Sequence, residues 1–270
     1  MDFMRRNKDK PMMLYFPIVL PHGPWVATPK RPDANETYDR FKAMVEYVDL
    51  TTGRLIKVLE EFNIRERTIV IFTTDNGTYR LLSARMNGRL VQGGKDQYRE
   101  SGMNVPFVVN CPGLVPEDTV TDALTDFTDM LPTFAELGGA TLPKNVTLDG
   151  KSIAPVILGV VKDSAREWIL AMGAGEMVQT KRGIHSTATV ADRVIRNKRY
   201  KLWFTDGRSS ALYDLKGDPN ENNNLIGSTD KENAAARREL EAVLQSLPSD
   251  AWPKYDPLPM RALGKHIDAR

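Results

Sequence analysis

The run RTIVIFTTD at residues 67–75 constrains the fold of this chain more than any other stretch. Its β-branched and aromatic residues are apolar almost throughout and do not alternate with polar ones. A strand of this kind is typical of the centre of an α/β sheet, where helices cover both faces. With 270 residues, of which 41% are hydrophobic, the chain is long enough to bury a sizeable core of that type.

Other periodic stretches extend this prediction. Apolar runs at residues 12–20 and 105–113 predict two further buried strands. Apolar residues that recur at threes and fours predict helices over residues 35–62 and 122–139, the second ending at a Gly-Gly pair. Strands that alternate with helices in this way indicate an α/β architecture.

The pattern of predicted elements changes beyond residue 160. Short strands follow one another closely, as in a small antiparallel sheet, and a strongly amphipathic helix comes after them. We therefore expect two parts, an α/β part over residues 1–160 and a small α+β subdomain over residues 161–270.

Composition excludes some classes of protein. The formal net charge is only +2, so nothing calls for a nucleic-acid or anionic membrane partner. No apolar run approaches the ~20 residues of a membrane span. The basic and then apolar N-terminus imitates a signal peptide, but two prolines interrupt it and no small-residue cleavage site follows, so we favour a strand. The single cysteine, Cys111, allows no intrachain disulfide and suits a small buried hydrophobe.

Asp75 and Asn76 are adjacent at the end of the strand predicted within residues 67–75. One interpretation is a tight turn, because Asn-Gly is the strongest short hairpin signal. No alternating strand follows Gly77 directly, which argues against that turn. The other interpretation is a metal site, since ligands of open α/β sheets lie beyond the carboxyl ends of strands. A carboxylate and an amide oxygen suit a hard divalent cation, calcium above all.

Three further residues are candidates for chemistry. His22, in PHGPW, follows a predicted strand and could donate a proton to a leaving group, although a structural histidine is the plainer interpretation. Lys95 follows Gly93 and Gly94 in a segment that departs from the phosphate-loop pattern, which leaves a surface lysine or a clamp on an anionic group. His185 lies in a basic stretch that suits a substrate pocket or a surface loop equally.

Taken in order, the segments of this chain resemble the later part of a sulfatase of the formylglycine-dependent family, within the alkaline-phosphatase-like superfamily. The resemblance runs from about Lys10 to Leu225 and rests on the order and spacing of its motifs, which are LPHGPW, FTTDNG, GGKDQYRESGMNVPFVVNCPG, DMLPTFAELGG, LDGKSIAPVILG, IRNKRYKLWF and LYDLKGDPNENNNL. It implies an alkaline-phosphatase-like central sheet flanked by helices, with its N-terminal strands missing, followed by a small antiparallel subdomain.

The resemblance also implies roles for named residues. Asp75 and Asn76 match the pair that binds the active-site calcium. Lys95 and His22 match the residues that contact the sulfate, with His22 near the leaving-group oxygen. The implied reaction is hydrolysis of a sulfate ester, either an aryl sulfate or a sulfated carbohydrate. The family setting implies a periplasmic or extracellular protein.

One departure from the family matters for activity. The family's nucleophile is a formylglycine made from the Cys or Ser of (C/S)-x-P-x-R, and no stretch of this sequence matches that pattern. Cys111 continues as Pro-Gly-Leu-Val, and Ser246 heads the nearest match with Asp250 in place of the arginine. We therefore expect a chain that begins partway through the family's sequence and has no activity on its own.

Alternatives stay open at this point. The chain could instead resemble a phosphodiesterase or phosphonate hydrolase of the same superfamily. It could be a non-catalytic protein that binds a sulfated glycan, or a relic without function. The particular sulfate ester and the oligomeric state are not decided by the sequence.

Overall fold

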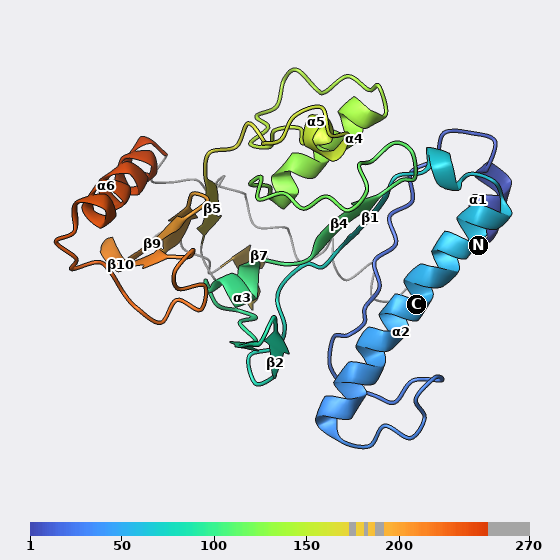
Figure 1. Ribbon diagram of the computed structural model, residues 1–270, viewed down its shortest axis with the longest axis horizontal. Helices are drawn as coiled ribbons and strands as arrows, with labels where there is room; N and C mark the ends of the chain where they lie inside the picture. Colours follow the sequence, from blue (N-terminus) through green and yellow to red (C-terminus); the bar gives the residue numbers. More distant parts are fainter. Residues whose placement is uncertain (173–176, 181–182, 187–191, 248–270) are drawn as a thin grey trace. The chain divides into compact units, whose positions relative to one another are not determined.

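A computed structural model of the protein describes residues 1–172, 177–180, 183–186 and 192–247 (Figure 1). These residues divide into two compact units that interleave along the chain. The first unit comprises residues 1–74, 106–119 and 157–159, and the second comprises the remainder. The boundary expected between residues 160 and 161 stays a prediction.

The first unit is built around the long helix α2 (Thr37–Glu61), which confirms the helix predicted over residues 35–62. The helix ends because Asn63 takes a left-handed conformation, with φ of 54°, and the Ile64 amide then donates to Leu59 O at 2.9 Å. Its C-terminal end packs against the short helix α1 (Asp2–Asn7) and the turn η1 (Arg65–Arg67). The core there consists of Met4, Val58, Leu59 and Ile64.

The first unit also contains strands β1 (Val70–Thr73) and β4 (Phe107–Asn110), which pair antiparallel with Val70 opposite Asn110. Both predicted strands are confirmed, but the central, doubly covered position expected for β1 is not found among the described residues, where β4 is its one neighbour. In the described part of the chain they form a two-stranded sheet, and β1 is half-buried along its length. Cys111, directly after β4, is buried as expected.

The strand predicted over residues 12–20 is wrong. The segment forms no strand in the structure, and Tyr15 and Val19 are 82% and 78% exposed. A strand needs a neighbouring chain to satisfy its amide groups, and apolar composition alone does not supply one. Pro11 and Pro17, which lack an amide hydrogen, weaken any ladder in this segment further.

In the second unit, strands β2 (Ser83–Met86) and β3 (Arg89–Gln92) form a hairpin. Its two-residue turn is Asn87-Gly88, whose φ values of 50° and 79° are those of the turn that Asn-Gly favours. The short helix α3 (Glu100–Met103) follows. The stretch between Gly77 and Gly102 is therefore structured rather than an open loop.

Helices η2 (Phe127–Asp129), α4 (Met130–Leu137) and α5 (Ala154–Ile157) follow. The helix predicted over residues 122–139 is confirmed in its second half and ends at Gly138 as expected. Asp129 is fully buried at its start and accepts hydrogen bonds from Arg166 Nε at 2.9 Å and from the Lys151 amide at 2.7 Å. Burial alone would raise the pKa of Asp129, but these hydrogen bonds lower it below its ordinary value.

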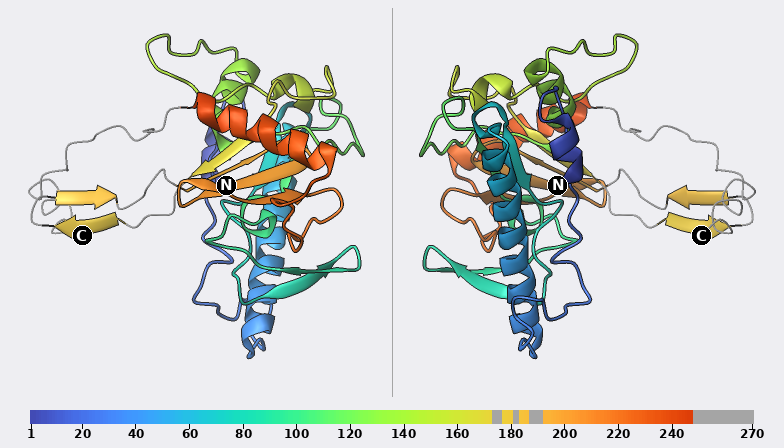
Figure 2. Two further views of the ribbon diagram at one scale, coloured as in Figure 1. Left: turned by 90° about the vertical axis from the view of Figure 1, so that its left-hand side faces the viewer. Right: turned by 90° about the vertical axis from the view of Figure 1, so that its right-hand side faces the viewer.

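A four-stranded antiparallel sheet confirms the subdomain predicted from the closely spaced strands. Its order is β10-β9-β8-β5, and its members are β5 (Ile169–Met172), β8 (Arg193–Arg196), β9 (Tyr200–Thr205) and β10 (Arg208–Asp214). Helix α6 (Lys231–Ser246) lies across one face of this sheet (Figure 2). The core between them includes Ile195, Leu202, Leu212 and Leu240, each at most 1% exposed.

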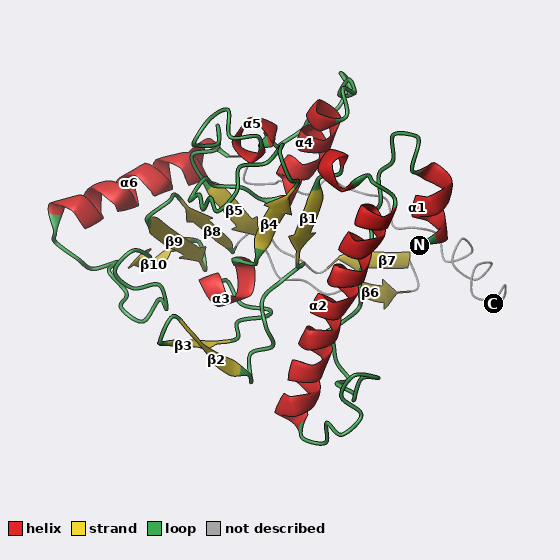
Figure 3. Cartoon of the chain, turned by 45° about the vertical axis from the view of Figure 1, so that its right-hand side comes forward, coloured by secondary structure: helices red, strands yellow, loops and turns green. Residues whose placement is uncertain are grey.

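The alternation of side chains along β9 gives this sheet two different faces. Tyr200, Leu202 and Phe204 point toward α6 and join its core. Lys201 and Trp203 therefore lie on the opposite face. A separate hairpin, β6 (Met177–Thr180) with β7 (Gly183–Ser186), completes the strands (Figure 3). In the described part of the chain no helix combines the length and apolar character that crossing a membrane requires.

Candidate functional site

Asp75 and Asn76 follow β1, and no hairpin forms there. The next strand, β2, pairs with β3 and not with β1, so the rejection of the hairpin turn at Asn76-Gly77 is confirmed. The Asp75 carboxylate is exposed, and its Oδ1 accepts a hydrogen bond from the Asn76 amide at 2.9 Å. Among the described residues it forms no ion pair, so its charge is available to a ligand.

Close backbone packing brings Lys95 to this segment. The Gly77 amide donates to Gly102 O at 2.9 Å, and the Lys95 amide donates to Thr78 O at 3.0 Å. A side chain cannot fit here, because a Cβ on Gly77 would lie 1.9 Å from Ser101 O. The glycines thus let two segments that are distant in sequence run against each other.

The Lys95 side chain is half-buried on this backbone. Within the described ranges its ammonium has no hydrogen bond or ion pair with another side chain, although acidic residues are close in sequence. A cation held by a packed backbone and not neutralised by an internal partner is suited to bind an anion.

His22 lies in an exposed loop of the first unit. Its Nδ1 is 2.7 Å from Gly23 O, and because a carbonyl oxygen only accepts, this contact assigns the proton to Nδ1. Nε2 is then the nitrogen that can exchange a proton with a ligand. The loop is anchored by Trp25, whose Nε1 donates to Pro21 O at 2.9 Å and whose ring packs edge-on against Phe41 of α2. The meeting of His22 with Asp75 stays a prediction.

His185 lies in strand β7, opposite Val178 of β6. Its side chain lies outside the described part of the structure, so its predicted role in substrate binding stays a prediction.

The oxygen donors of Asp75 and Asn76 are of the chemical type that a hard cation prefers. One carboxylate and one amide oxygen are ligands that calcium accepts, but calcium takes about 6–8 oxygen ligands. In the described residues no group of three or more His, Cys, Asp or Glu side chains is gathered in a way that could hold a metal. Two such donors would fill only part of a calcium shell.

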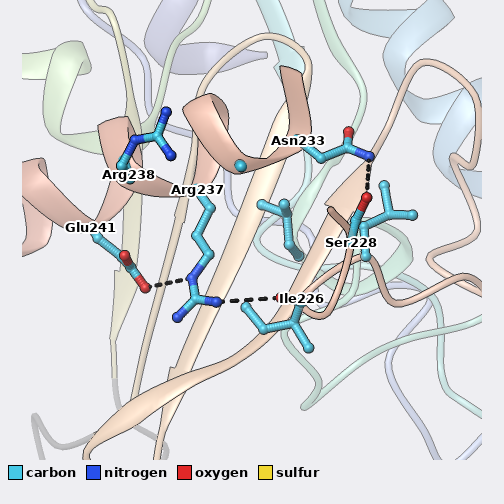
Figure 4. Close-up of a pocket in the computed structure, with 9 residues that line it drawn as sticks. Ile226, Ser228, Asn233, Arg237, Arg238 and Glu241 are labelled. Carbon is cyan, nitrogen blue, oxygen red and sulfur yellow. Dashed lines mark hydrogen bonds and ion pairs between the residues drawn. The ribbon is translucent and has the colours of Figure 1, made fainter. Parts of the chain in front are cut away.

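A pocket of about 200 Å³ lies elsewhere, between α6 and the turn at Ile226 (Figure 4). Arg237 lines it, donating to Glu241 Oε1 at 2.8 Å and to Ile226 O at 3.3 Å. Because this guanidinium is already engaged and none of the five predicted site residues lines the pocket, we do not assign it a catalytic role.

Sequence reasoning missed a group of buried charges beside the Lys95 segment. Lys201 is fully buried, and its ammonium lies 3.1 Å from Glu100 Oε1 and 2.9 Å from Glu221 Oε1. The sequence carries no signal for this burial, since a lysine within YKLWF of an antiparallel sheet predicts a half-buried strand whose lysine faces solvent. Its partners could not be read from the sequence.

Comparison with known proteins places the chain among sulfatases. A family model described as "Sulfatase" matches residues 1–140, and a second, described as "N-sulphoglucosamine sulphohydrolase, C-terminal", matches residues 94–250. Human arylsulfatase A is 29% identical over 266 residues, covering 90% of this chain and 49% of the relative. An N-acetylgalactosamine-6-O-sulfatase of Bacteroides thetaiotaomicron is 27% identical over 257 residues, covering 91% of this chain and 49% of the relative. The chain therefore spans about half the length of these relatives.

A solved structure gives the same result for the fold. This solved structure is described under the metabolism of multiple glycosaminoglycans by Bacteroides thetaiotaomicron. It aligns with a TM-score of 0.67 and 23% identity, over 91% of this chain and 52% of that one. The expected fold class, alkaline-phosphatase-like with a small antiparallel subdomain, is confirmed.

Proposed function

The chain belongs to the sulfatase family, and from this premise we propose that it carries the calcium-binding and sulfate-contacting residues of a sulfate ester hydrolase. The observation that supports this best is the glycine-packed backbone that joins the Lys95 amide to Thr78 O and the Gly77 amide to Gly102 O, directly after Asp75 and Asn76. The segment that carries the Lys95 cation thus packs against the segment that follows two oxygen donors, and a sulfate group and a calcium ion together would use this combination.

The chemistry assigns a task to each residue. Cleavage of a sulfate ester places negative charge on the sulfuryl oxygens and on the departing alkoxide. Lys95 contacts the sulfuryl oxygens as a point charge. His22, as an imidazolium, gives its Nε2 proton to the alkoxide and becomes the neutral ring whose remaining Nδ1 proton is held by Gly23 O. Asp75 and Asn76 would hold calcium, which supplies further positive charge to the sulfuryl oxygens.

The substrate that we propose is a sulfated carbohydrate or an aryl sulfate. The names of the two relatives support both classes, since one is an arylsulfatase and the other acts on N-acetylgalactosamine 6-O-sulfate. His185, in a basic stretch, is proposed as a further substrate contact.

These 270 residues on their own should release no sulfate, because no Cys or Ser of the sequence stands in the motif that is converted to formylglycine. The test is incubation of the purified chain with 4-nitrocatechol sulfate, with and without calcium. Calcium-dependent release of 4-nitrocatechol would disprove this part of the proposal.

Binding can be tested without turnover. We expect calorimetric titration to detect N-acetylgalactosamine 6-sulfate in the presence of calcium. Lys95→Ala should weaken that binding about tenfold to a hundredfold, the usual worth of a hydrogen bond to a charged group, whereas Lys162→Ala, which removes an exposed lysine of the same unit, should leave it unchanged. Equal loss in both variants, or no loss in Lys95→Ala, would contradict the proposed role of Lys95.

Calcium binding has its own matched pair of variants. Asp75→Asn keeps the shape of the side chain and removes its charge, so calcium affinity should fall at least tenfold, on the order of the loss of one charged ligand. Asp96→Asn makes the same change at an exposed carboxylate close by in the same unit and should change the affinity little. Calcium titration that shows the same affinity for all three proteins would rule out this site.

The absence of the nucleophile motif also favours a second function, a protein that binds sulfated glycan without cleaving it. That function would be established if the protein binds the sulfated sugar but does not cleave it, even with calcium present and with the family's formylglycine motif restored to the protein. A tighter fit for the matching phosphate ester than for the sulfate would instead favour the phosphodiesterase or phosphonate hydrolase alternative.

A further inference from the structure

Four charged side chains lie together where the Lys95 segment meets the four-stranded sheet. They are Glu100 of α3, Arg196 of β8, Lys201 of β9 and Glu221, which follows β10. The side chains of Lys201 and Glu221 are 0% and 1% exposed, and those of Glu100 and Arg196 are 12% and 17% exposed. We call these four residues the charge network.

The sheet itself creates the need for Glu100. Arg196 and Lys201 are directly opposite each other in the pairing of β8 with β9. Both lie on the face turned away from α6, because their neighbours Ile195 and Leu202 point into the α6 core. Like charges directly opposite each other destabilise a sheet. Glu100 resolves this, since one carboxylate oxygen contacts Arg196 and the other lies 3.1 Å from Lys201 Nζ.

Glu221 completes the network from the other side. Its Oε2 accepts a hydrogen bond from the Glu100 amide at 2.6 Å, and its Oε1 lies 2.9 Å from Lys201 Nζ. Oε1 accepts no aligned hydrogen bond, so its attraction to Lys201 is that of an ion pair. The adjacent Asn220 adds two contacts, since its carbonyl accepts from Arg99 at 2.9 Å and its side chain accepts from Arg89.

Aromatic packing supports the same junction. The Tyr98 ring lies edge-on against Trp203 of β9, with centroids 6.0 Å apart. Lys201 Nζ lies 6.0 Å from the centre of the same Trp203 ring. Residues 89–100, which include Lys95, are thus held at both ends, by Asn220 at Arg89 and by the sheet at Tyr98 and Glu100.

A buried ion pair is a poor choice for stability alone. Well-packed apolar residues of similar volume often stabilise a protein as much or more. What charged groups add is direction, because Glu100 can satisfy two cations only at one place on the sheet. From this we infer that Lys201 and Glu221 are positioning residues, which hold the segment from Gly93 to Gly102 so that Lys95 stays on Thr78, shortly after Asp75 and Asn76. This inference rests on the proposed role of Lys95 in binding sulfate.

The test uses a variant that keeps the charge balance of the network. Lys201→Met with Glu221→Gln removes one positive and one negative charge and leaves Glu100 paired with Arg196. The matched control is Arg237→Met with Glu241→Gln, which removes an ion pair of α6 that is 40% and 25% exposed.

Hydrogen exchange is the first measurement. In the network variant the amides of Gly93, Lys95 and Gly102 should exchange at least about tenfold faster, as expected for local opening, while the core amides of Leu202 and Leu212 stay protected. The control should change none of them. If the network variant does not fold, Glu221→Gln alone is measured by the same criterion. Unchanged exchange at Lys95 and Gly102 would overturn the inference.

Affinity for N-acetylgalactosamine 6-sulfate distinguishes a network that positions Lys95 for binding from one that only stabilises the segment. The network variant should bind this sugar at least about tenfold more weakly, and the loss should vanish when Lys95 is already alanine, since the two changes then act through one side chain. Faster exchange with unchanged affinity would overturn the positioning role. Unchanged affinity in Lys95→Ala would instead refute the proposed function. Hydrogen exchange reports the opening of the segment independently of sugar binding, so the two failures can be told apart.

Discussion

The contact between Gly77 and Ser101 provides the sharpest test of the site's architecture. In Gly77→Ala the new Cβ would lie 1.9 Å from Ser101 O, whereas ordinary contacts begin at 3.4 Å. The two backbones must therefore part by about 1.5 Å, and the 2.9 Å hydrogen bond from the Gly77 amide to Gly102 O is lost. Overpacking costs about 1–3 kcal/mol and the lost hydrogen bond about 1 kcal/mol, so unfolding should become easier by roughly 2–4 kcal/mol.

The matched control is Gly53→Ala. Gly53 lies inside α2, and a Cβ there would meet nothing within 4 Å. Alanine is the better helix former, so this variant should be more stable than the natural chain by about 0.5–1 kcal/mol. The same chemical change thus has opposite effects at the two positions.

The assay is urea unfolding followed by circular dichroism, together with calcium titration of the folded variants. Gly77→Ala should also weaken calcium binding, because a shift of about 1 Å in the backbone next to Asn76 misplaces its side chain. A stability within 0.5 kcal/mol of the natural chain, or equal effects in both variants, would refute the close packing described for this segment.

Two further predictions concern other parts of the fold. Asp129→Asn should destabilise the protein by about 1–3 kcal/mol, because it removes the fully buried carboxylate that pairs with Arg166 and leaves that guanidinium only the Asp126 carboxylate, at 3.1 Å, and urea unfolding measures this. Since the pKa of Asp129 is lowered in the folded chain, its stabilisation is present above the ordinary value of 3.8 and is lost as the pH falls through the folded value. Urea midpoints should therefore drop more steeply with acid in the natural chain than in the variant. Gly88→Val should destabilise the β2–β3 hairpin by roughly 1–2 kcal/mol through its φ of 79°, and faster proteolysis within residues 83–92 would report it, with unchanged cleavage contradicting the turn.

Local patterns predicted the elements that depend on local interactions. The helix expected over residues 35–62 is α2, and the closely spaced apolar runs near the C-terminus are the strands of an antiparallel sheet. Both outcomes follow from periodicity, because a helix satisfies its own amides and short connections join antiparallel neighbours. The strand prediction for residues 12–20 was wrong because a strand needs a neighbouring strand, and an apolar run does not show whether one is present.

The two Asn-Gly pairs show the limit of a local signal. Asn87-Gly88 is a hairpin turn and Asn76-Gly77 is not, although the dipeptides are identical. The difference lies in the flanking residues, which pair on both sides of the first turn. After Gly77 the backbone instead packs against Gly102, a contact that depends on residues far along the chain.

The types of residue available for chemistry can be read from the amino-acid sequence, and the order of its motifs indicates the family. Which of those residues meet depends on how distant segments pack in the folded chain. The Lys95 amide reaches Thr78 O, two residues after Asn76, because glycines allow two backbones to touch. Lys201 can be buried with its charge because Glu100, 101 positions away, arrives from another element to neutralise it. Such encounters depend on packing across the whole unit, and no local preference encodes them.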